Sequence, residues 1–230
     1  MTIRYGVVGA GWISQTAFLP GTGLTGNSRT TALVSGSADT AGQLAAFHDI
    51  PHVFPYDRYD EMLAADLVDA VYIALPNTLH ADYAIRAARA GKHVLVEKPL
   101  AVSVEECRAM IDAAQDAGVF LMTAYRLHTE PGTLHVLDLI RQGSIGDPRL
   151  FSSVFAFQAG PDNHRLAARH WGGPLQDIGI YCLNAARHVF ADEPVTVQAM
   201  RTASDDPRFA EVEECHAATL LFPGGRAAQF

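Results

Sequence analysis

Residues 93–100 read His-Val-Leu-Val-Glu-Lys-Pro-Leu, and this stretch decides which fold the chain can adopt. Residues 94–96 form an apolar run without a polar side, which is typical of a strand buried on both faces of a parallel sheet. Ligands bind outside the carboxyl ends of such strands, so we expect Lys98 to face a binding crevice. Pro99 fixes its own backbone and keeps Lys98 out of the helical region, which predicts a rigid turn. The simpler interpretation is an ordinary strand end, where Lys98 is solvated and paired with Glu97.

Length and composition limit the classes of protein to which the chain can belong. Its 230 residues suit one large or two modest domains, and we expect two. Hydrophobic residues make up 49% and charged residues 18%, as in ordinary globular proteins. The formal net charge of −8 argues against partners that are nucleic acids or anionic membranes. No apolar stretch approaches the roughly 20 residues that a membrane-spanning helix needs.

The N-terminus and the cysteines indicate a compartment. The first residues lead almost directly into a strand and leave no room for a signal peptide, so we expect a cytoplasmic protein. The three cysteines, Cys107, Cys182 and Cys215, are odd in number and show no C-x-x-C spacing. They therefore indicate neither a disulfide framework nor a structural zinc site, and we expect them to be small apolar residues.

A glycine-rich turn follows the first predicted strand, residues 3–8. Residues 9–14 read Gly-Ala-Gly-Trp-Ile-Ser and match the G-x-G-x-x-G/A phosphate-binding fingerprint, with Ser14 in the third glycine's place. The pyrophosphate of a dinucleotide would lie on the amides of a helix that starts near Ile13. Glycine pairs also mark ordinary turns, but this one stands where the fingerprint is expected. The predicted cofactor-binding residues here are Gly9, Gly11, Trp12 and Ile13.

The second predicted strand, residues 30–34, ends in Ser35, Gly36 and Ser37, which favours NADP over NAD. An NAD enzyme usually has a carboxylate at this strand end, which binds the ribose 2′-hydroxyl and repels a 2′-phosphate. These three residues carry no charge and can donate hydrogen bonds to a phosphate. No basic residue follows at once, and Thr40 stands where one could have been, so NAD stays the alternative.

Further helices and strands alternate up to residue 124 and predict a doubly wound parallel sheet, a Rossmann fold that binds a dinucleotide. We expect helices at 39–48, near 59–63, at 81–91 and at 103–117, and strands at 52–54, 68–75, 93–97 and 119–123.

One of these strands, residues 68–75, ends at a candidate site. Leu75 and Pro76 close the strand, and Asn77 or Thr78 could cap the helix that follows. His80 lies in the first turns of this helix, near the expected cofactor edge. A single histidine is often a satisfied structural residue, and that role is the alternative for His80.

The pattern changes at residue 125 and predicts a second domain of the α+β class, 125–230, with a mostly antiparallel open sheet. We expect helices at 131–142 and 174–190, strands at 149–157, 195–202, 214–222 and 227–230, and irregular chain at 158–173. In the second helix, Asp177, Tyr181, Asn184 and His188 share one face. A simply solvated face would carry Lys, Glu and Arg more often, so these residues favour a cleft.

The motifs Gly-Ala-Gly-Trp-Ile-Ser, Pro-Asn-x-x-His and Gly-Lys-His-Val-Leu-Val-Glu-Lys-Pro resemble those of the Gfo/Idh/MocA family of pyridine-nucleotide oxidoreductases. Residues 172–181 look most like the branch of glucose–fructose oxidoreductase and dihydrodiol dehydrogenase. The pairs Tyr125-Arg126, Arg165-Leu166 and Glu193-Pro194 fit the same branch. The family's substrate domain continues well beyond residue 230, so we expect a C-terminally truncated chain, whose full-length form would oligomerise through the C-terminal sheet.

The resemblance assigns roles to three residues. Lys98 would contact the nicotinamide ribose and the substrate oxygen, Tyr181 would donate or accept the proton, and Asp177 would bind a substrate hydroxyl. The substrate would be a small polyol: a sugar, a cyclitol or a diol. The predicted cofactor-binding residues beyond the glycine turn are Ser35, Gly36, Ser37, Leu75, Pro76, Asn77, His80, Glu97, Lys98 and Arg126.

The chemistry itself also asks for such residues. Oxidising a secondary alcohol or hemiacetal moves a hydride to nicotinamide C4 and a proton to a base, while negative charge develops on oxygen. Tyrosine alone is a weak base, and the hypothesis is that the ammonium group of Lys98 favours the phenolate of Tyr181.

Three alternatives compete with this hypothesis. A short-chain dehydrogenase would need Tyr-x-x-x-Lys, which none of the seven tyrosines provides. A non-catalytic NADP-binding sensor or regulatory protein would not need Lys98, Asp177 and Tyr181 together. A zinc-dependent dehydrogenase could use residues 213–216, Glu-Glu-Cys-His, but alternating strand residues would not converge on one metal, and we predict no metal site.

Overall fold

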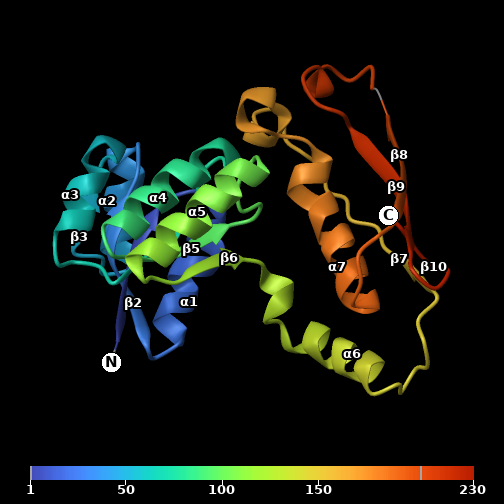
Figure 1. The fold of residues 1–230 in the computed structure, drawn as a ribbon. Coiled ribbons are helices and arrows are strands. Elements are labelled where there is room, and N and C mark those ends of the chain that lie inside the picture. Colours follow the sequence, from blue (N-terminus) through green and yellow to red (C-terminus); the bar gives the residue numbers. More distant parts are fainter. Residues whose placement is uncertain (1, 203) are drawn as a thin grey trace. The chain divides into compact units, whose positions relative to one another are not determined.

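The computed structural model describes residues 2–202 and 204–230 (Figure 1). The chain divides into two compact units, Met1–Ala124 and Tyr125–Phe230. In the described ranges, none of the helices has the length and apolar character that crossing a bilayer requires.

The first unit contains a six-stranded sheet in which every neighbouring pair is parallel and the strand order is β3-β2-β1-β4-β5-β6. The order reverses between β1 and β4, which is the point where doubly wound sheets bind ligands. The predicted Rossmann fold is therefore confirmed. The strands are β1 (Ile3–Val8), β2 (Ser28–Val34), β3 (His52–Phe54), β4 (Ala70–Ile73), β5 (His93–Glu97) and β6 (Leu121–Ala124).

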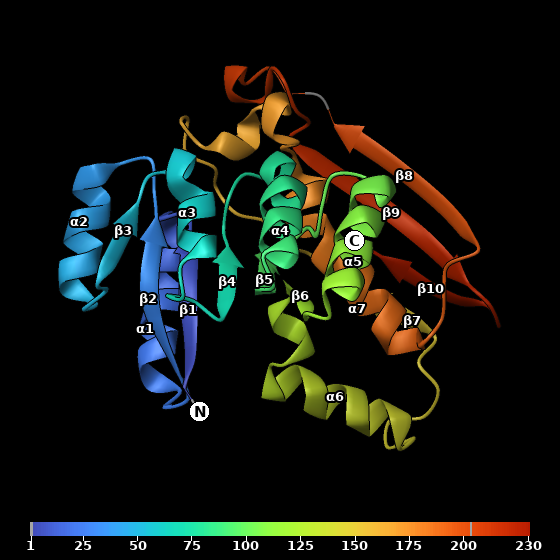
Figure 2. The same cartoon turned by 60° about the vertical axis from the view of Figure 1, so that its left-hand side comes forward.

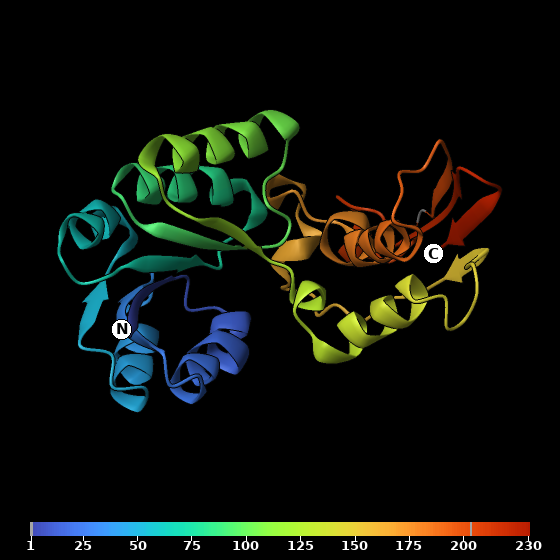
Figure 3. The same ribbon diagram turned by 60° about the horizontal axis from the view of Figure 1, so that its bottom comes forward.

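Helices cover both faces of this sheet (Figure 3). One core joins the sheet to α3, α4 and α5, and the other joins it to α1 and α2. The helices are α1 (Leu19–Leu24), α2 (Ala38–Phe47), α3 (Tyr59–Ala64), α4 (His80–Arg89) and α5 (Val104–Ala117), with shorter turns at η1 (Ser14–Phe18), η2 (Tyr56–Arg58) and η3 (Asn77–Leu79).

The central strands are buried on both faces, as their apolar runs predict. Val7, Val8 and Ile73 are completely buried, and so is Val96 in β5. Leu95 is only half-buried, so the two faces of β5 are not covered equally. These buried strands give the loops at their carboxyl ends a rigid base.

The second unit contains a mixed four-stranded sheet in the order β7-β10-β9-β8 (Figure 2). Two of its pairs are antiparallel, and β7 pairs with β10 in parallel. Its core joins α7 to β9 and β10 through Ala186, Phe190, Leu220, Phe222 and Ala228. The elements are α6 (Pro131–Arg141), β7 (Leu150–Ser152), α7 (Ile180–Phe190), β8 (Thr196–Thr202), β9 (Cys215–Phe222) and β10 (Arg226–Gln229), with short turns at η4 (Arg126–His128), η5 (His164–Leu166), η6 (Ala168–His170), η7 (Leu175–Gly179) and η8 (Pro207–Phe209).

Two local predictions were wrong, and one predicted helix begins with an irregular turn. The predicted strand 149–157 is limited to β7, because β10 pairs with residues 150–152 alone. The predicted helix 174–190 is confirmed over residues 175–190, where the π-helical turn η7 leads directly into the α-helix α7. Neither Asn77 nor Thr78 is the helix cap, because both lie inside η3. The cap positions are Pro76 for η3 and Leu79 for α4, and neither Pro76 nor Leu79 makes a side-chain cap hydrogen bond.

Candidate functional site

The turn after β1 can only be built with glycine at position 9. Gly9 has φ of +103°, and a Cβ atom there would lie 2.3 Å from the carbonyl oxygen of Ala74. The amide of Gly9 donates to the carbonyl of Val34 over 2.9 Å, which ties the turn to the end of β2. The ends of β1, β2 and the segment after β4 are thus in direct backbone contact.

The next residues of the turn leave space beside the backbone. A Cβ atom at Gly11 would meet nothing within 4 Å, and Trp12 is 75% exposed. Ser14 is completely buried and its hydroxyl donates to the carbonyl of Gly9 over 2.6 Å. Serine in the third fingerprint position therefore fits the close packing and also closes the turn. Because Gly11 faces open space at the amino end of a helical segment, these residues fit a dinucleotide pyrophosphate.

The segment after β2 forms a turn held by its own hydroxyl groups. Ser37 caps α2 by accepting a hydrogen bond from the amide of Thr40 over 3.3 Å. The hydroxyl of Ser35 accepts from the amide of Ser37 over 3.2 Å, and Ser35 is only 8% exposed. Ser35 therefore shapes this turn, whereas Gly36 and Ser37 are exposed and available to a ligand.

Hydrogen bonds through Glu97 fix the segment after β5. The hydroxyl of Tyr72 donates to one oxygen of Glu97 over 2.6 Å, and the backbone amide of Lys98 donates to the other over 3.2 Å. Tyr72 is 2% exposed and stacks on Phe18, with ring centroids 3.9 Å apart. The anchored carboxylate orients the half-buried Lys98, and the peptide bond between Lys98 and Pro99 is cis.

His80, a predicted cofactor-binding residue, is completely buried. One ring nitrogen lies 2.8 Å from the carbonyl of Pro99 and the other 2.9 Å from the carbonyl of Leu75. With both nitrogens turned to the protein, the structural alternative suits this side chain better than direct cofactor contact.

Pro76 and Asn77, the other two predicted cofactor residues after β4, lie in the segment that leads to His80. Pro76 and Asn77 are half-buried and lead from the end of β4 into η3, directly before His80.

In the second unit, Tyr181 lies among aromatic rings. Its ring centroid is 5.1 Å from that of Tyr125 and 5.4 Å from that of Phe155. The hydroxyl of Tyr125 donates to the carbonyl of Ile180, the residue before Tyr181, over 2.6 Å. Burial raises the pKa of Tyr125, so this phenol stays protonated and keeps donating. Tyr125 therefore fixes the start of α7 and packs against the ring of Tyr181.

Asp177 precedes Tyr181 by one turn and forms an ion pair with Arg165, with 2.7 Å between Oδ2 and Nε. The side chain of Asp177 is 13% exposed and that of Arg165 is 40% exposed. Both line a cavity of about 660 Å³, which also includes Gly173 and Cys182. The volume lies in the range of small-molecule pockets.

The predicted polar face of the second helix separates into two groups. The amide oxygen of Asn184 accepts a hydrogen bond from Nε2 of His128 over 3.1 Å, and the ring of His128 lies 4.8 Å from that of His188. Burial lowers the pKa of His188, and His128 acts in the same direction. Asp177 pairs with Arg165, and Tyr181 is linked to the histidines through Tyr125, whose ring contacts both Tyr181 and His128.

Arg126, the remaining predicted cofactor residue, is exposed in the turn η4 and directly follows Tyr125. Lys98 belongs to the first unit and Tyr181 to the second. Their pairing, and the cofactor role of Arg126, stay predictions.

Residues 213–216, which the zinc-dependent alternative would use, do not all lie in a strand, so their side chains do not simply alternate between two faces. Glu213 precedes β9, and its carboxylate lies 2.5 Å from Nε2 of His216, so these two side chains meet. No group of three or more His, Cys, Asp or Glu in the ranges 2–202 and 204–230 is arranged to hold a metal ion.

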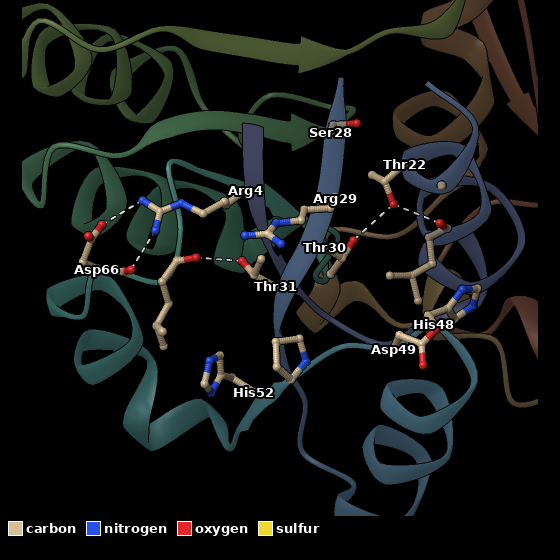
Figure 4. Close-up of a pocket in the computed structure, with 14 residues that line it drawn as sticks. Arg4, Thr22, Ser28, Arg29, Thr30, Thr31, His48, Asp49, His52 and Asp66 are labelled. Carbon is tan, nitrogen blue, oxygen red and sulfur yellow. Dashed lines mark hydrogen bonds and ion pairs between the residues drawn. The ribbon is translucent and has the colours of Figure 1, made fainter. Parts of the chain in front are cut away.

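The first unit has a cavity of about 490 Å³ at the opposite edge of its sheet, around the starts of β1, β2 and β3 (Figure 4). Arg4 lines it and pairs with Asp66 over 2.7 Å. None of the predicted site residues lines this cavity, so it does not compete with the carboxyl edge for the cofactor role.

Comparison with known proteins identifies the family. Residues 3–125 match the oxidoreductase family with an NAD-binding Rossmann fold, and residues 133–230 match the GFO/IDH/MocA C-terminal domain. The chain belongs to the Gfo/Idh/MocA family. The resemblance stated from the motifs is therefore confirmed.

Several known oxidoreductases are similar over most of the chain. An NADP-dependent D-xylose 1-dehydrogenase of Haloarcula marismortui is 35% identical over 96% of this chain and 64% of its own length. An NADP-dependent scyllo-inositol 2-dehydrogenase of Bacillus subtilis is 36% identical over 82% of this chain and 58% of its own length. Aldose–aldose oxidoreductase of Caulobacter crescentus, crystallised with glycerol, has a TM-score of 0.94 and 38% identity, covering 100% of this chain and 70% of that one. The chain thus spans about two thirds of the length of such relatives.

The sequence signals missed some side chains that surround the predicted site of this family member. Phe155 was expected within a strand and instead contacts Tyr181, and Arg165 was expected in irregular chain and pairs with Asp177. The pair Arg165-Leu166 was one of the motifs that supported the resemblance, so this motif could have identified Arg165 as a site residue. No local pattern predicts the contact of Phe155, because it depends on where the strand ends.

Proposed function

We propose that this protein is an NADP-dependent oxidoreductase that transfers a hydride between nicotinamide C4 and a secondary alcohol or hemiacetal carbon of a sugar, cyclitol or diol. The observation that carries the proposal is the carboxyl edge of the first sheet. There the backbone requires glycine at position 9, Gly11 faces open space, and the amide of Lys98 donates a hydrogen bond to Glu97. The names of the relatives, dehydrogenases that use NADP on xylose and on inositol, support it.

The preference for NADP rests on the segment after β2. Gly36 and Ser37 are exposed at the amino end of α2, and no carboxylate stands among residues 35–37. A helix amino end favours an anionic group such as a 2′-phosphate, whereas Asp39 in the first turn of α2 acts against it. NAD is the weaker alternative.

The residues divide the chemistry between them. The nicotinamide, when bound, supplies the hydride acceptor or donor. Tyr181 moves the hydroxyl proton at its phenolic oxygen, and Lys98 stabilises negative charge on the substrate oxygen. Asp177, oriented by Arg165, accepts a hydrogen bond from a neighbouring substrate hydroxyl. The residues that bind the cofactor are those of the glycine turn, the segments after β2, β4 and β5, and Arg126.

Fluorescence titration with NADPH and with NADH tests the cofactor half of the proposal. We expect NADPH to bind at least about tenfold more tightly, which corresponds to about 1.4 kcal/mol. Ser37→Asp places a carboxylate at the predicted phosphate site and should reverse the order. Equal binding of both, unchanged by Ser37→Asp, would contradict the assignment of this segment. Tight NADPH binding without turnover on any aldose, cyclitol or diol would support the sensor alternative.

We also propose that two copies associate through the outer face of the second unit's sheet. Leu150, Met200 and Leu221 are 63%, 65% and 46% exposed, and the register places Leu150 and Leu221 on either side of Ala227. Exposed apolar side chains gathered on one face of a sheet favour association. Met200→Lys should shift the mass measured by light scattering toward the monomer, and an unchanged mass would contradict the interface.

We place the protein in the cytoplasm. Its three cysteines are free, without a disulfide, which suits a reducing compartment. Fractionation of cells that produce the protein would check this.

A further inference from the structure

His80 contacts two segments, one on each side of the predicted nicotinamide site of the first unit. Leu75 follows β4 and Pro99 follows Lys98, and the histidine ring lies between their carbonyl oxygens at 2.9 and 2.8 Å. The ring is completely buried, so water does not compete for either contact. We propose that His80 is a positioning residue that ties these two segments together and thereby holds Lys98 in place.

The backbone around Lys98 needs such a contact. Proline has no N–H, so the carbonyl is the one hydrogen-bonding group that the backbone of Pro99 offers. On the other side of Lys98, its amide donates to Glu97, which Tyr72 holds in turn. Side chains therefore fix the chain before and after Lys98, and His80 provides the contact that follows it.

The chemistry of the ring suits two carbonyl acceptors. A carbonyl oxygen only accepts, so a neutral imidazole donates to one of them and an imidazolium donates to both. Burial lowers the pKa of His80, whereas the carbonyls of Pro99 and Leu75 act in the opposite direction. In both protonation states the ring fills the space between the two segments and donates to at least one of them.

His93 offers a matched control at the other end of the same strand. Its Nδ1 accepts a hydrogen bond from the amide of Phe120 over 3.0 Å, and its ring contacts that of Phe120. His93→Leu removes one histidine hydrogen bond at the start of β5, whereas His80→Leu removes the ring contacts to two carbonyl oxygens beyond its carboxyl end. An effect of losing any histidine next to this strand would appear in both variants.

Amide hydrogen exchange of the whole chain, measured by mass spectrometry, tests the proposal without requiring activity. We expect His80→Leu to speed exchange at residues 76–79 and 98–102 by about tenfold or more, while exchange in β1 is unchanged. His93→Leu should speed exchange only near residues 118–121. Uniform acceleration across the unit, or none at 98–102, would overturn the positioning role.

A cavity variant keeps the proposal testable if His80→Leu does not fold. His80→Ala leaves space for a free imidazole, which can replace the lost ring. Added imidazole should restore slow exchange at residues 98–102, and 1-methylimidazole, with one nitrogen blocked, should not. Equal effects of the two compounds, or no effect of either, would contradict a contact through both nitrogens.

The consequence for catalysis rests on the proposed function. Displacing a catalytic group by about 1 Å can cost about 100-fold in rate, so His80→Leu should lower kcat by at least tenfold. The KM for NADPH should stay within about threefold, and His93→Leu should retain the wild-type kcat. An unchanged kcat in His80→Leu would overturn the role. A wild-type protein without turnover would contradict the proposed function, and the exchange experiment would then decide on His80 alone.

Discussion

The carboxyl edge of the first sheet and the start of α7 in the second unit are built differently. The edge is made mainly of backbone: the amide of Gly9 contacts Val34, the amide of Ala74 contacts Val8, and a Cβ atom at Gly9 would meet a carbonyl at 2.3 Å. The start of α7 is made of side chains, with Tyr181 among aromatic rings and Asp177 paired with Arg165. A site made of backbone is sensitive to added atoms, and a site made of side chains is sensitive to removed functional groups.

Removing the phenolic oxygen of Tyr181 should have the largest effect on activity and a small effect on stability. General acid–base groups contribute about 10²- to 10⁴-fold, so we expect Tyr181→Phe to lower kcat by about 10³-fold. The ring contacts with Tyr125 and Phe155 are retained, and the free energy of unfolding should fall by less than about 1.5 kcal/mol. Steady-state kinetics and urea unfolding measure the two quantities. Full turnover in Tyr181→Phe would show that another group moves the proton.

Adding one methyl group at two neighbouring glycines should separate folding from cofactor binding. Gly9→Ala strains a positive φ and drives a Cβ into the carbonyl of Ala74, so we expect a loss of about 3 kcal/mol or more in unfolding free energy. Gly11→Ala meets nothing within 4 Å and should keep its stability, yet bind NADPH at least about tenfold more weakly. If Gly11→Ala bound NADPH as the wild type does, the pyrophosphate would not lie on this turn.

Removing a helix cap should have a smaller effect on the same edge. Ser37→Ala removes the acceptor for the amide of Thr40, and caps of this kind contribute about 1 kcal/mol. Ser103→Ala is a matched control, because Ser103 caps α5 in the same way through the amide of Glu106. Both variants should lose similar stability in urea unfolding, and only Ser37→Ala should also weaken NADPH binding. Equal NADPH binding in both would remove Ser37 from the cofactor site.

The smallest effect concerns acid stability at the opposite edge. The hydrogen bonds and charge of Arg4 lower the pKa of Asp69 below its ordinary value, so ionised Asp69 stabilises the folded state. This contribution is present above the unfolded-state pKa of about 4 and is lost as the pH falls through the lower folded-state pKa. Asp69→Asn should therefore be less stable at pH 7, by under about 1 kcal/mol, and the difference should shrink toward pH 2. A constant difference between pH 7 and pH 2 would contradict the ion pair.

Sequence periodicity predicted the first unit well because its strands are buried on both faces and its turns depend on local residues. The apolar run at 94–96 requires burial on both faces, and the glycine turn requires a residue without a side chain. Short segments were therefore enough to predict the strand, the turn and the helix. Ser14 is an example, since its small size was expected, although its hydrogen bond to Gly9 was not.

The second unit was harder to predict because its contacts come from distant segments. The alternating residues 149–157 had the pattern of a strand, yet only residues 150–152 find a partner in β10. Phe155 consequently leaves the sheet and packs on Tyr181. Likewise, the i, i+4 spacing predicted a shared face for Asp177 to His188 but not their partners, which come from other segments: Arg165 for Asp177, and His128 for Asn184 and His188.

His80 shows what a motif can and cannot reveal. The motif Pro-Asn-x-x-His placed it near the cofactor edge, and the structure places it between the carbonyls of Leu75 and Pro99. Nothing local in the sequence predicts a partner 19 residues away, so a direct cofactor contact and a structural role could not be separated beforehand.

The most direct test of the central claim is hydride transfer by the purified protein. NADP is mixed with an aldose, a cyclitol or a trans-diol, and the absorbance of the reduced nicotinamide is followed for the wild type, Tyr181→Phe and Gly11→Ala. We predict NADP reduction by the wild type with at least one of these substrates, a roughly 10³-fold slower reaction in Tyr181→Phe, and a raised KM for NADP in Gly11→Ala. Tight NADPH binding by a wild type that reduces NADP with none of the three classes would contradict the account.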